Sequence, residues 1–415
     1  MPRAILSVVV LTMATWAQAA DWPQFYGPQR NGVSSETDLA ATWPVGGPRE
    51  LWAFSLGPGY CGVAVQGGKV YLLDREQEKQ EIVRCLDLAT GREDWNFAYD
   101  APAKVTWEGS RSTPSVDDTC VFTVGVTGEI LCVDKTTHKP RWQKNIFTLY
   151  GGKPPRFSVS QSPLLYKDMV IVAPQSQQAC LSALKKSDGL EVWRSAPLGD
   201  GMQYSSPVLA NLEGVDQVVL LKREGLLAVD PATGTTLWTY KGQDCWDPAP
   251  APVHLGGGRF FINGSGAGGA FFQVSRAGEQ WQLTGLFKDK ALFDAQVQAA
   301  VPYQGYLYVN GNSEKKDRYG LTCLDFEGHM QWQTQNQPSI ELGSLVIANG
   351  LLYYMDGKSG TLTMAQASPA GYHELARAKV LTAAKGMCWA SLAISDGKLL
   401  CRDQKELKCL DIRHP

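Results

Sequence analysis

Five histidines are the side chains of this 415-residue chain best suited to proton transfer or metal binding near neutral pH. No two of them stand at the short spacing of a metal-binding pair, and no Gly-x-Ser-x-Gly motif presents a nucleophilic serine. Three lie in segments that we interpret below as separate turns pointing apart. We therefore predict no catalytic residues and no metal site. The five are His138, His254, His329, His373 and His414.

A glycine-rich run could instead bind a phosphate group. Residues 263–269 (NGSGAGG) contain Gly-x-Gly-x-x-Gly through Gly264, Gly266 and Gly269, directly after the apolar residues 260–262. A dinucleotide site also needs a helix N-terminus behind the glycines. Residues 270–274 (AFFQV) are typical of another strand, so we interpret the run as a hairpin turn and predict no cofactor-binding residues.

The secondary-structure elements that would position a functional site can be predicted from a segment that repeats along the chain. Residues 85–95 (CLDLATGREDW) return in variant form six more times, and about 43 to 51 residues separate the ends of successive copies. Periods of this length are typical of propeller blades and helical arrays. The copies end at Trp95, Trp142, Trp193, Trp238, Trp281, Trp332 and Leu375.

Each repeat is predicted to consist of strands. Its apolar runs are short, β-branched and aromatic, and turn residues bound them, whereas no segment after the N-terminus has the apolar spacing of a helix. Within the repeat, Asp87 can accept backbone N–H groups and Gly91 can supply a positive φ, which makes a tight hairpin. Four strands with two apolar faces need neighbours on both sides, and a radial ring provides them.

The number of blades follows from the two ends of the chain. Residues 389–412 supply three strands of a last repeat without an outer strand, and residues 47–54 repeat the glycine-to-tryptophan pattern without inner strands. Natural sheets avoid exposed strand edges, and pairing the two segments would leave none. We therefore predict an all-β fold, an eight-bladed β-propeller of four-stranded antiparallel blades, with the ring closed by the N-terminal strand.

Ten cysteines would ordinarily suggest a disulfide framework in an exported chain. The repeats argue against one, because Cys85, Cys132, Cys323 and Cys409 occupy a position that alanine fills elsewhere, which indicates a small buried residue. We expect mostly free thiols. Cys401 and Cys409, on facing strands of one hairpin, are the pair that could be bonded.

Residues 1–19 have the pattern of a signal peptide, with a basic start, an apolar run and a small-x-small cleavage site. We therefore predict an exported protein, periplasmic or secreted, without a transmembrane segment. No cysteine follows the cleavage site to carry a lipid. Residues 20–46, rich in proline, glycine and aromatics, are predicted to be an irregular arm over the propeller, and residues 47–415 a single propeller domain.

The charge balance restricts the class of partner. The formal net charge is −2 and the isoelectric point is near 6.2, which argues against a nucleic-acid partner.

One aligned position varies in a way that suggests binding. Aligning the starts of the innermost strands places Tyr60, Arg111, Ser160, Tyr204, Ala249, Val297, Leu342 and Trp389 in one slot of the eight blades. This slot should surround the mouth of the central channel. A position with a purely structural role should hold side chains of similar size in every blade, whereas this one mixes aromatics, arginine and alanine. Aromatic residues together with arginine are typical of the anchors of protein interfaces. Tyr60, Arg111, Tyr204 and Trp389 are therefore the predicted binding residues, with irregular filling of a narrow channel as the alternative.

The pattern small-Leu-Asp-x-x-Thr-Gly-x-x-x-Trp, as in residues 85–95, resembles the PQQ-type β-propeller repeat of the quinoprotein alcohol dehydrogenase-like superfamily. The resemblance covers roughly residues 43–412. It implies one of two branches, quinone-dependent dehydrogenases or cofactor-free scaffolds similar to the outer-membrane protein assembly factor BamB. The start of the mature chain, residues 22–28 (WPQFYGP), looks like that of BamB-like propellers, although the chain lacks their lipidated cysteine. It also lacks the adjacent Cys-Cys pair and the long blade insertions of the dehydrogenases.

These patterns favour an exported, non-catalytic scaffold that binds another protein, in outer-membrane protein assembly if the resemblance to BamB extends to function. The alternatives are a PQQ-dependent dehydrogenase and a propeller that binds a small molecule or glycan. We expect no cofactor, with PQQ as the open alternative. A family name records a fold and does not by itself imply a bound quinone.

Overall fold

The computed structural model describes residues 20–198, 201–242, 244–289, 297–310, 320–335, 340–383 and 387–414. The predicted signal peptide, residues 1–19, lies outside these ranges. Within them, no helix has the length and apolar character needed to span a membrane.

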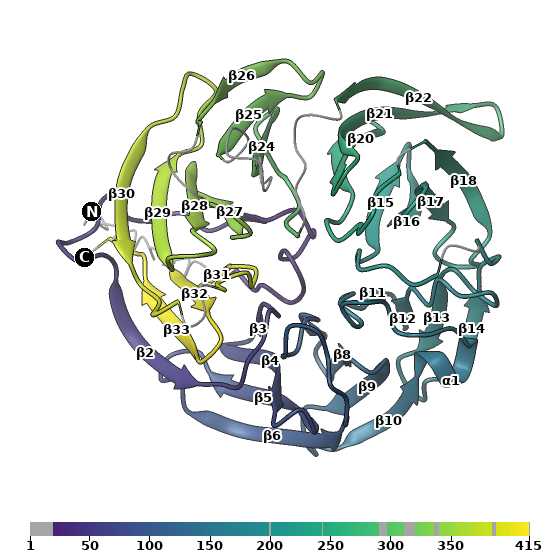
Figure 1. Cartoon of the computed structure of the whole chain (residues 1–415), viewed down its shortest axis with the longest axis horizontal. Coiled ribbons are helices and arrows are strands. Elements are labelled where there is room, and N and C mark those ends of the chain that lie inside the picture. The colour runs from purple at the N-terminus through teal and green to yellow at the C-terminus, as the bar shows by residue number, and fades with distance from the viewer. Residues whose placement is uncertain are drawn as a thin grey trace, which may run out of the picture.

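The strands form eight sheets that are arranged radially as blades around a central axis (Figure 1). In blades 1 to 7 the chain starts at the innermost strand and moves outward, strand by strand. In blade 8 the outermost strand comes from the other end of the chain. The predicted all-β, eight-bladed propeller of four-stranded antiparallel blades is thereby confirmed.

The strand bounds are given blade by blade. Blades 1 to 4 comprise β3 (Ala64–Gln66), β4 (Lys69–Glu76), β5 (Gln80–Asp87), β6 (Glu93–Asp100); β7 (Ser115–Val116), β8 (Cys120–Val124), β9 (Glu129–Asp134), β10 (Pro140–Asn145); β11 (Leu164–Tyr166), β12 (Met169–Val172), β13 (Ser182–Lys185), β14 (Glu191–Arg194); β15 (Val208–Leu212), β16 (Val215–Lys222), β17 (Gly225–Val229) and β18 (Thr236–Lys241). Blades 5 to 7 comprise β19 (Val253–Gly256), β20 (Arg259–Gly264), β21 (Gly268–Ala277), β22 (Gln280–Asp289); β23 (Val301–Tyr303), β24 (Tyr306–Asn310), β25 (Leu321–Asp325), β26 (Met330–Gln333); β27 (Leu345–Ala348), β28 (Leu351–Met355), β29 (Thr361–Gln366) and β30 (Glu374–Lys379). Blade 8 comprises β31 (Ala393–Ser395), β32 (Lys398–Arg402), β33 (Glu406–Asp411) and β2 (Arg49–Ser55), and a short strand of the arm, β1 (Val33–Ser34), adds to blade 7.

Ring closure occurs through the predicted pair of strands. Strand β2 pairs antiparallel with β33, so that Trp52 lies opposite Cys409 and Phe54 lies opposite Leu407. Blade 8 therefore joins the two ends of the chain, and its core is continuous with that of blade 1.

The repeated turn serves as a docking site for the neighbouring blade. Gly234 has φ of 72°, and a Cβ atom there would lie 2.4 Å from Cε3 of Trp193 in the preceding blade. The indole Nε1 of Trp193 donates to the carbonyl of Pro231 at 3.0 Å in the same turn. Glycine is therefore needed both for its φ and for the space that the indole ring takes. Trp52 against Gly91 and Trp142 against Gly189 repeat this contact.

The repeat position that holds cysteine or alanine lies opposite the repeat tryptophan on the neighbouring strand. Cys85 is opposite Trp95, Ala183 is opposite Trp193 and Cys409 is opposite Trp52. A larger side chain would compete with the indole ring for the space between blades. All ten cysteines are buried and none forms a disulfide bond, in line with the expectation of mostly unbonded thiols. On the facing strands, Cys401 lies opposite Lys408 rather than Cys409.

The repeat tryptophans differ in how completely the neighbouring blade covers them. Trp142, Trp193 and Trp238 are buried, with exposed fractions of 7, 7 and 5 %. Trp95 and Trp332 keep part of their surface exposed. The contribution of this residue to stability should therefore vary from blade to blade.

A chain of hydroxyl contacts links blades at the inner ends of their loops. The backbone N–H of Gly62 donates to Thr113 Oγ1 at 3.0 Å, that of Thr113 donates to Ser162 Oγ at 3.0 Å, and that of Ser162 donates to Ser206 Oγ at 2.9 Å. Each of these residues stands two positions after a slot residue. The contacts therefore hold the loops that carry the predicted binding residues.

Two local expectations have different outcomes. The glycine-rich run is a hairpin between β20 and β21, with Gly264 opposite Gly268, as predicted. The expectation of no helix is wrong for α1 (Ile146–Tyr150), whose first turn is capped by Asn145 Oδ1 accepting from Phe147 N at 2.9 Å. At five residues the helix is too short to show a periodic apolar pattern in the sequence.

Candidate functional site

The slot residues lie in the loops that lead into the innermost strands. Seven of them stand four positions before the first residue of the strand, and Leu342 stands three positions before β27. The expectation that they begin the strands is therefore wrong, although their positions in the blades correspond. Because loops adapt more readily than strands, this layer can vary in residue type without disturbing the blades.

Three of the four predicted binding residues meet in one cluster. The rings of Tyr60 and Trp389 stack with centroids 5.4 Å apart and an interplanar angle of 27°. Arg111 Cζ lies 5.5 Å from the centroid of the Tyr60 ring. The ring of Trp107 meets Trp389 edge-on at 5.8 Å. These four residues, here called the mouth cluster, come from loops that enter blades 1, 2 and 8.

Arg111 fixes the loop that carries Trp107. Its Nη1 donates to the carbonyl of Gly109 at 2.6 Å, and its Nη2 donates to the carbonyls of Thr106 and Trp107, the latter at 2.5 Å. Burial lowers the pKa of Arg111 to about 10, so the group stays charged at neutral pH. Arg111 thus clamps the loop through its carbonyl groups.

Trp107 was not among the predicted residues. Its exposed fraction is 51 %, and its φ of 61° lies in the left-handed region, which costs a bulky residue about 1–3 kcal/mol. Such conformations persist only where surrounding contacts impose them. The available signal was a tryptophan outside the repeat position, in the loop between β6 and β7.

Tyr204, the fourth predicted residue, belongs to a different environment. It is 7 % exposed, its ring lies 5.7 Å from that of Phe157, and its hydroxyl accepts from the Phe157 N–H at 3.3 Å. Burial raises its pKa. The charge of Arg111 acts to lower the pKa of Tyr204, so the two residues are not remote, but no ring contact or hydrogen bond among the described residues joins Tyr204 to the mouth cluster.

The polar groups of the mouth are largely used within the protein. The hydroxyl of Tyr60 donates to Met387 Sδ at 3.3 Å, and burial raises the pKa of Tyr60. The amide of Gln404 donates to the carbonyls of Gly59 at 2.9 Å and Met387 at 3.2 Å. The surface that remains for a ligand is therefore mainly aromatic.

The N-terminal arm crosses the centre of the ring of blades (Figure 1). The hydroxyl of buried Tyr26 donates to Gln298 Oε1 at 2.6 Å, and Gln298 Nε2 donates to the carbonyl of Trp389 at 2.7 Å. The guanidinium of Arg30 donates to the carbonyls of Pro163 and Pro207, the latter at 2.9 Å.

These contacts have an electrostatic consequence for Arg30. The side chain is bonded to neutral oxygen atoms of blades 3 and 4, and burial lowers its pKa to about 9. The arm therefore places a positive charge within the ring.

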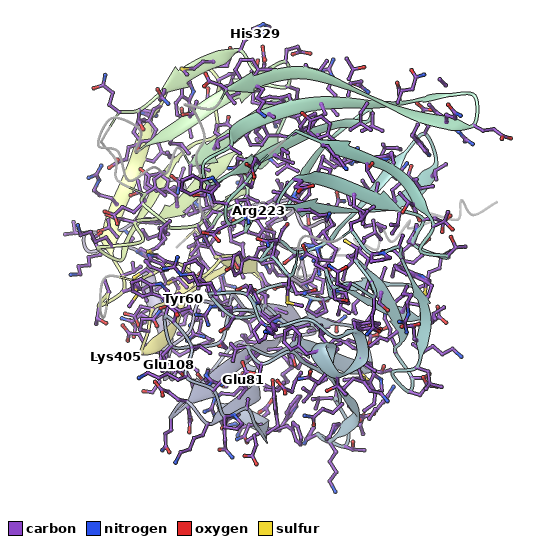
Figure 2. All side chains as sticks on the ribbon, turned by 45° about the vertical axis from the view of Figure 1, so that its right-hand side comes forward. Tyr60, Glu81, Glu108, Arg223, His329 and Lys405 are labelled. Atoms are coloured by element: carbon purple, nitrogen blue, oxygen red, sulfur yellow. The ribbon has the colours of Figure 1, made fainter. Side chains whose placement is uncertain are left out.

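A buried carboxylate joins blades 1 and 2 near the mouth. Glu81 accepts from the hydroxyl of Tyr99 at 2.9 Å and from the backbone N–H of Val126 at 3.1 Å. Burial raises the pKa of Glu81 to about 7. Nearby, buried Arg75 Nε donates to Glu108 Oε1 at 2.7 Å. Glu108 lies on the loop of Trp107, in the same part of the molecule as Tyr60 (Figure 2).

The histidines do not form a site among the described residues. His329 lies at the outer rim (Figure 2), where its Nδ1 is 2.9 Å from Asp325 Oδ2. His138 stacks on Trp95 of the neighbouring blade at 4.9 Å. In the described part of the chain, no three His, Cys, Asp or Glu side chains gather as metal ligands would.

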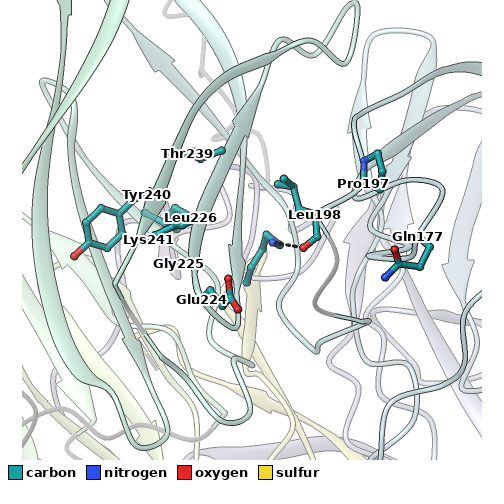
Figure 3. A pocket seen from close by; sticks show the side chains of 10 residues that line it. Gln177, Pro197, Leu198, Glu224, Gly225, Leu226, Thr239, Tyr240 and Lys241 are labelled. Carbon is teal, nitrogen blue, oxygen red and sulfur yellow. Dashed lines mark hydrogen bonds between the residues drawn. The ribbon is translucent and has the colours of Figure 1, made fainter.

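A separate pocket of about 330 Å³ lies between blades 3 and 4 (Figure 3). Within it, the ammonium of Lys222 donates to the carbonyl of Leu198 at 3.0 Å. The pocket shares no residue with the mouth cluster. Its lining adjoins residues 199–200, which lie outside the described ranges.

The ring of eight antiparallel blades, closed by a strand from the opposite end and joined by tryptophans docked on glycine turns, defines the class: a PQQ-type β-propeller. A family model described as outer membrane protein assembly factor BamB matches residues 78–293, more than half of the chain. The chain belongs to this family. No curated protein sequence matches it.

Solved structures share the fold at low sequence identity. BamB from Moraxella catarrhalis is similar with a TM-score of 0.62 and 14 % identity, over 88 % of this chain and 98 % of that chain. Quinohemoprotein alcohol dehydrogenase from Comamonas testosteroni is similar with a TM-score of 0.63 and 13 % identity, over 95 % of this chain and 81 % of that chain. Quinohemoprotein alcohol dehydrogenase ADHIIG from Pseudomonas putida HK5 is similar with a TM-score of 0.67 and 11 % identity, over 95 % of this chain and 80 % of that chain. These similarities show the fold.

Proposed function

We propose that the protein is an exported, non-catalytic scaffold that binds another protein through the mouth cluster. Export rests on the signal-peptide pattern of residues 1–19. The observation that carries the binding proposal is the combination of an aromatic mouth with an arm of the protein that is bonded to the inner loops of several blades. Membership of the BamB family further suggests a partner in outer-membrane protein assembly.

Protein binding agrees with the composition of the mouth. Tyr60 and Trp389 are stacked and partly exposed, and Trp107 extends their surface outward. Clustered aromatic side chains commonly supply most of the binding energy of an interface, about 2 kcal/mol or more for each central residue.

Cross-linking in the native host tests the site. The wild type is compared with the double variant Arg111→Ala/Trp389→Ala, and with Leu190→Ala/Val192→Ala as the control on the exposed outer edge at β14. We expect the first variant to lose a cross-linked partner and the control to keep it. The same partners in all three would refute the mouth as the binding site, and loss only in the edge variant would place the partner at the outer edge of blade 3.

Quinone-dependent oxidation is a second candidate, favoured by the similarity to two quinohemoprotein alcohol dehydrogenases. The residues at the centre of the ring do not fit a quinone held with a metal cation. Arg30 already places a positive charge there, and Tyr26 fills the adjoining space. A cation next to a fixed guanidinium would be repelled in this low-dielectric environment.

The test of this candidate is direct. Purified protein incubated with PQQ and Ca²⁺ is assayed for quinone absorbance and for reduction of an artificial electron acceptor by alcohols and sugars. We expect neither. Activity that follows the bound quinone would replace the scaffold proposal with a dehydrogenase.

A further inference from the structure

Two tryptophans stand out on the loops that connect the blades. Trp107 and Trp246 are 51 and 68 % exposed, and they are the exposed tryptophans of the described residues. They differ in their surroundings. The ring of Trp107 meets Trp389 at 5.8 Å and its carbonyl accepts from Arg111. The backbone N–H of Trp246 instead donates to the carbonyl of Ser265 at 3.0 Å, and its ring lies beside Gly266. Trp107 is therefore a fixed extension of the mouth surface, whereas Trp246 belongs to the loop before blade 5.

The shape and chemistry of this surface restrict its ligand. Trp107, Trp389 and Tyr60 present contiguous aromatic rings, and the nearby side-chain donors of Tyr60 and Gln404 already bond within the protein. A sugar needs several outward hydrogen-bonding groups, and the described residues of this surface offer few, since the unpartnered indole N–H of Trp389 is itself buried. Aromatic-lined surfaces instead suit the rigid rings of a proline-containing segment, which loses little entropy on binding.

Charge near the surface favours an acidic partner. Lys104 lies on the loop of Trp107, and Lys405 follows Gln404 at the mouth. Both lysines are exposed, and neither forms an ion pair with a described residue. Three acidic groups lie near these lysines, and each has a partner: Glu108 is bound to Arg75 at 2.7 Å, Asp403 accepts from Thr382 at 2.9 Å, and Glu406 lies 3.7 Å from Lys408. Burial raises the pKa of the Tyr60 hydroxyl, and the positive charge of two guanidinium groups near its ring, Arg111 and Arg402, acts to lower it. The field around the aromatic rings is therefore basic, which attracts carboxylates.

We propose that the surface of Trp107, Trp389 and Tyr60 binds an extended, proline-containing segment flanked by acidic residues on the partner protein. This inference rests on the proposed function and specifies the partner's chemistry. Trp107 is the anchor of the interaction, and Arg111 acts on it indirectly by holding the loop.

The backbone of Trp107 permits a clean variant. Because φ is 61°, glycine suits this position better than alanine, so Trp107→Gly removes the ring and also relieves strain. We expect Trp107→Gly to unfold at a denaturant concentration equal to or above that of the wild type. Trp246→Ala is the matched control, an exposed tryptophan outside the mouth cluster.

Calorimetric titration uses three synthetic probes: a peptide with two Pro-Pro-x-Pro runs flanked by glutamates, the same peptide flanked by lysines, and a linear hexasaccharide of N-acetylglucosamine. We expect binding of the acidic peptide, weakened about tenfold or more by Trp107→Gly and about twofold or less by Trp246→Ala. The lysine peptide should bind more weakly, and added salt should reduce this difference.

Several results overturn the inference. They are no binding of the acidic peptide, equal loss in both tryptophan variants, or a preference for the lysine peptide. Binding of the hexasaccharide that depends on Trp107 would assign the surface to glycans. If the host partner is lost in Arg111→Ala/Trp389→Ala while the acidic peptide does not bind, the proposed function stands and this inference fails.

Discussion

Replacing Glu81 with glutamine should change how the stability of the propeller depends on pH. The carboxylate links two blades, because it accepts from Tyr99 of its own blade and from the Val126 N–H of the next. Glutamine can still accept both hydrogen bonds through its Oε1 atom, but it does not ionise. The comparison therefore isolates the charge of Glu81.

The magnitude follows from the two pKa values. Burial raises the pKa of Glu81 from its usual 4.5 to about 7 in the folded chain. Between these values the unfolded chain has lost a proton that the folded chain keeps, so stability falls as pH rises. The contribution of protonated Glu81 to the free energy of unfolding is fully present below pH 4.5 and is lost above pH 7. The difference between these two pKa values corresponds to about 3 kcal/mol in the free energy of unfolding.

Urea denaturation followed by tryptophan fluorescence, from about pH 5 to about pH 8, measures this effect. The stability of Glu81→Gln relative to the wild type should rise by up to about 3 kcal/mol over that range. Glu213→Gln, in the exposed turn between β15 and β16, is the control for a carboxylate lost from the surface. A difference between Glu81→Gln and the wild type that stays constant with pH would refute the assignment of a buried, neutralised carboxyl group.

Three further outcomes test the blade contacts and the arm. Trp193→Ala should lower the free energy of unfolding by about 3–5 kcal/mol, and Trp332→Ala by less because that ring is partly exposed; equal losses in urea denaturation would contradict this. Gly234→Ala should destabilise more than Gly214→Ala, by about 1–3 kcal/mol in the same assay, since both have positive φ but only at 234 would Cβ meet a ring, 2.4 Å away; equal effects would refute the docking role. Arg30→Ala should leave the buried carbonyl of Pro207 unpaired, at about 1–3 kcal/mol, while the carbonyl of Pro163 keeps its bond from Ser115 Oγ at 2.6 Å. The variant should also expose residues 20–46 to limited proteolysis, and an equally resistant arm would show that Arg30 does not hold it.

The blades could be predicted because each repeat carries its own local information. Asp87 accepts the N–H of Thr90 at 3.0 Å, and Gly91 has φ of 70°, so this turn forms from neighbours in the sequence. Alternation and turn spacing then define the strands. The missing outer strand of the last repeat and the unpaired strand at residues 47–54 together indicated ring closure, which the pairing of β2 with β33 confirms.

The site could be predicted only in part. Alignment of the blades selected Tyr60, Arg111 and Trp389, which share a cluster. It also selected Tyr204, which packs against Phe157 instead, because equivalent positions in different blades face different neighbours. It missed Trp107, since this loop lies outside the repeat and no periodic pattern describes it.

The sequence by itself determined the blade, its turns and the number of blades, because these depend on hydrogen bonds and alternation within a few residues. Only the tertiary structure decided which side chains meet at the mouth, since Tyr60 and Trp389 come from opposite ends of the chain and touch only after the ring closes. It also decided that the arm crosses the centre of the ring. The contacts of Tyr26 with Gln298 and of Arg30 with Pro207 join residues that no local rule relates, and they exist because several blades converge on one axis.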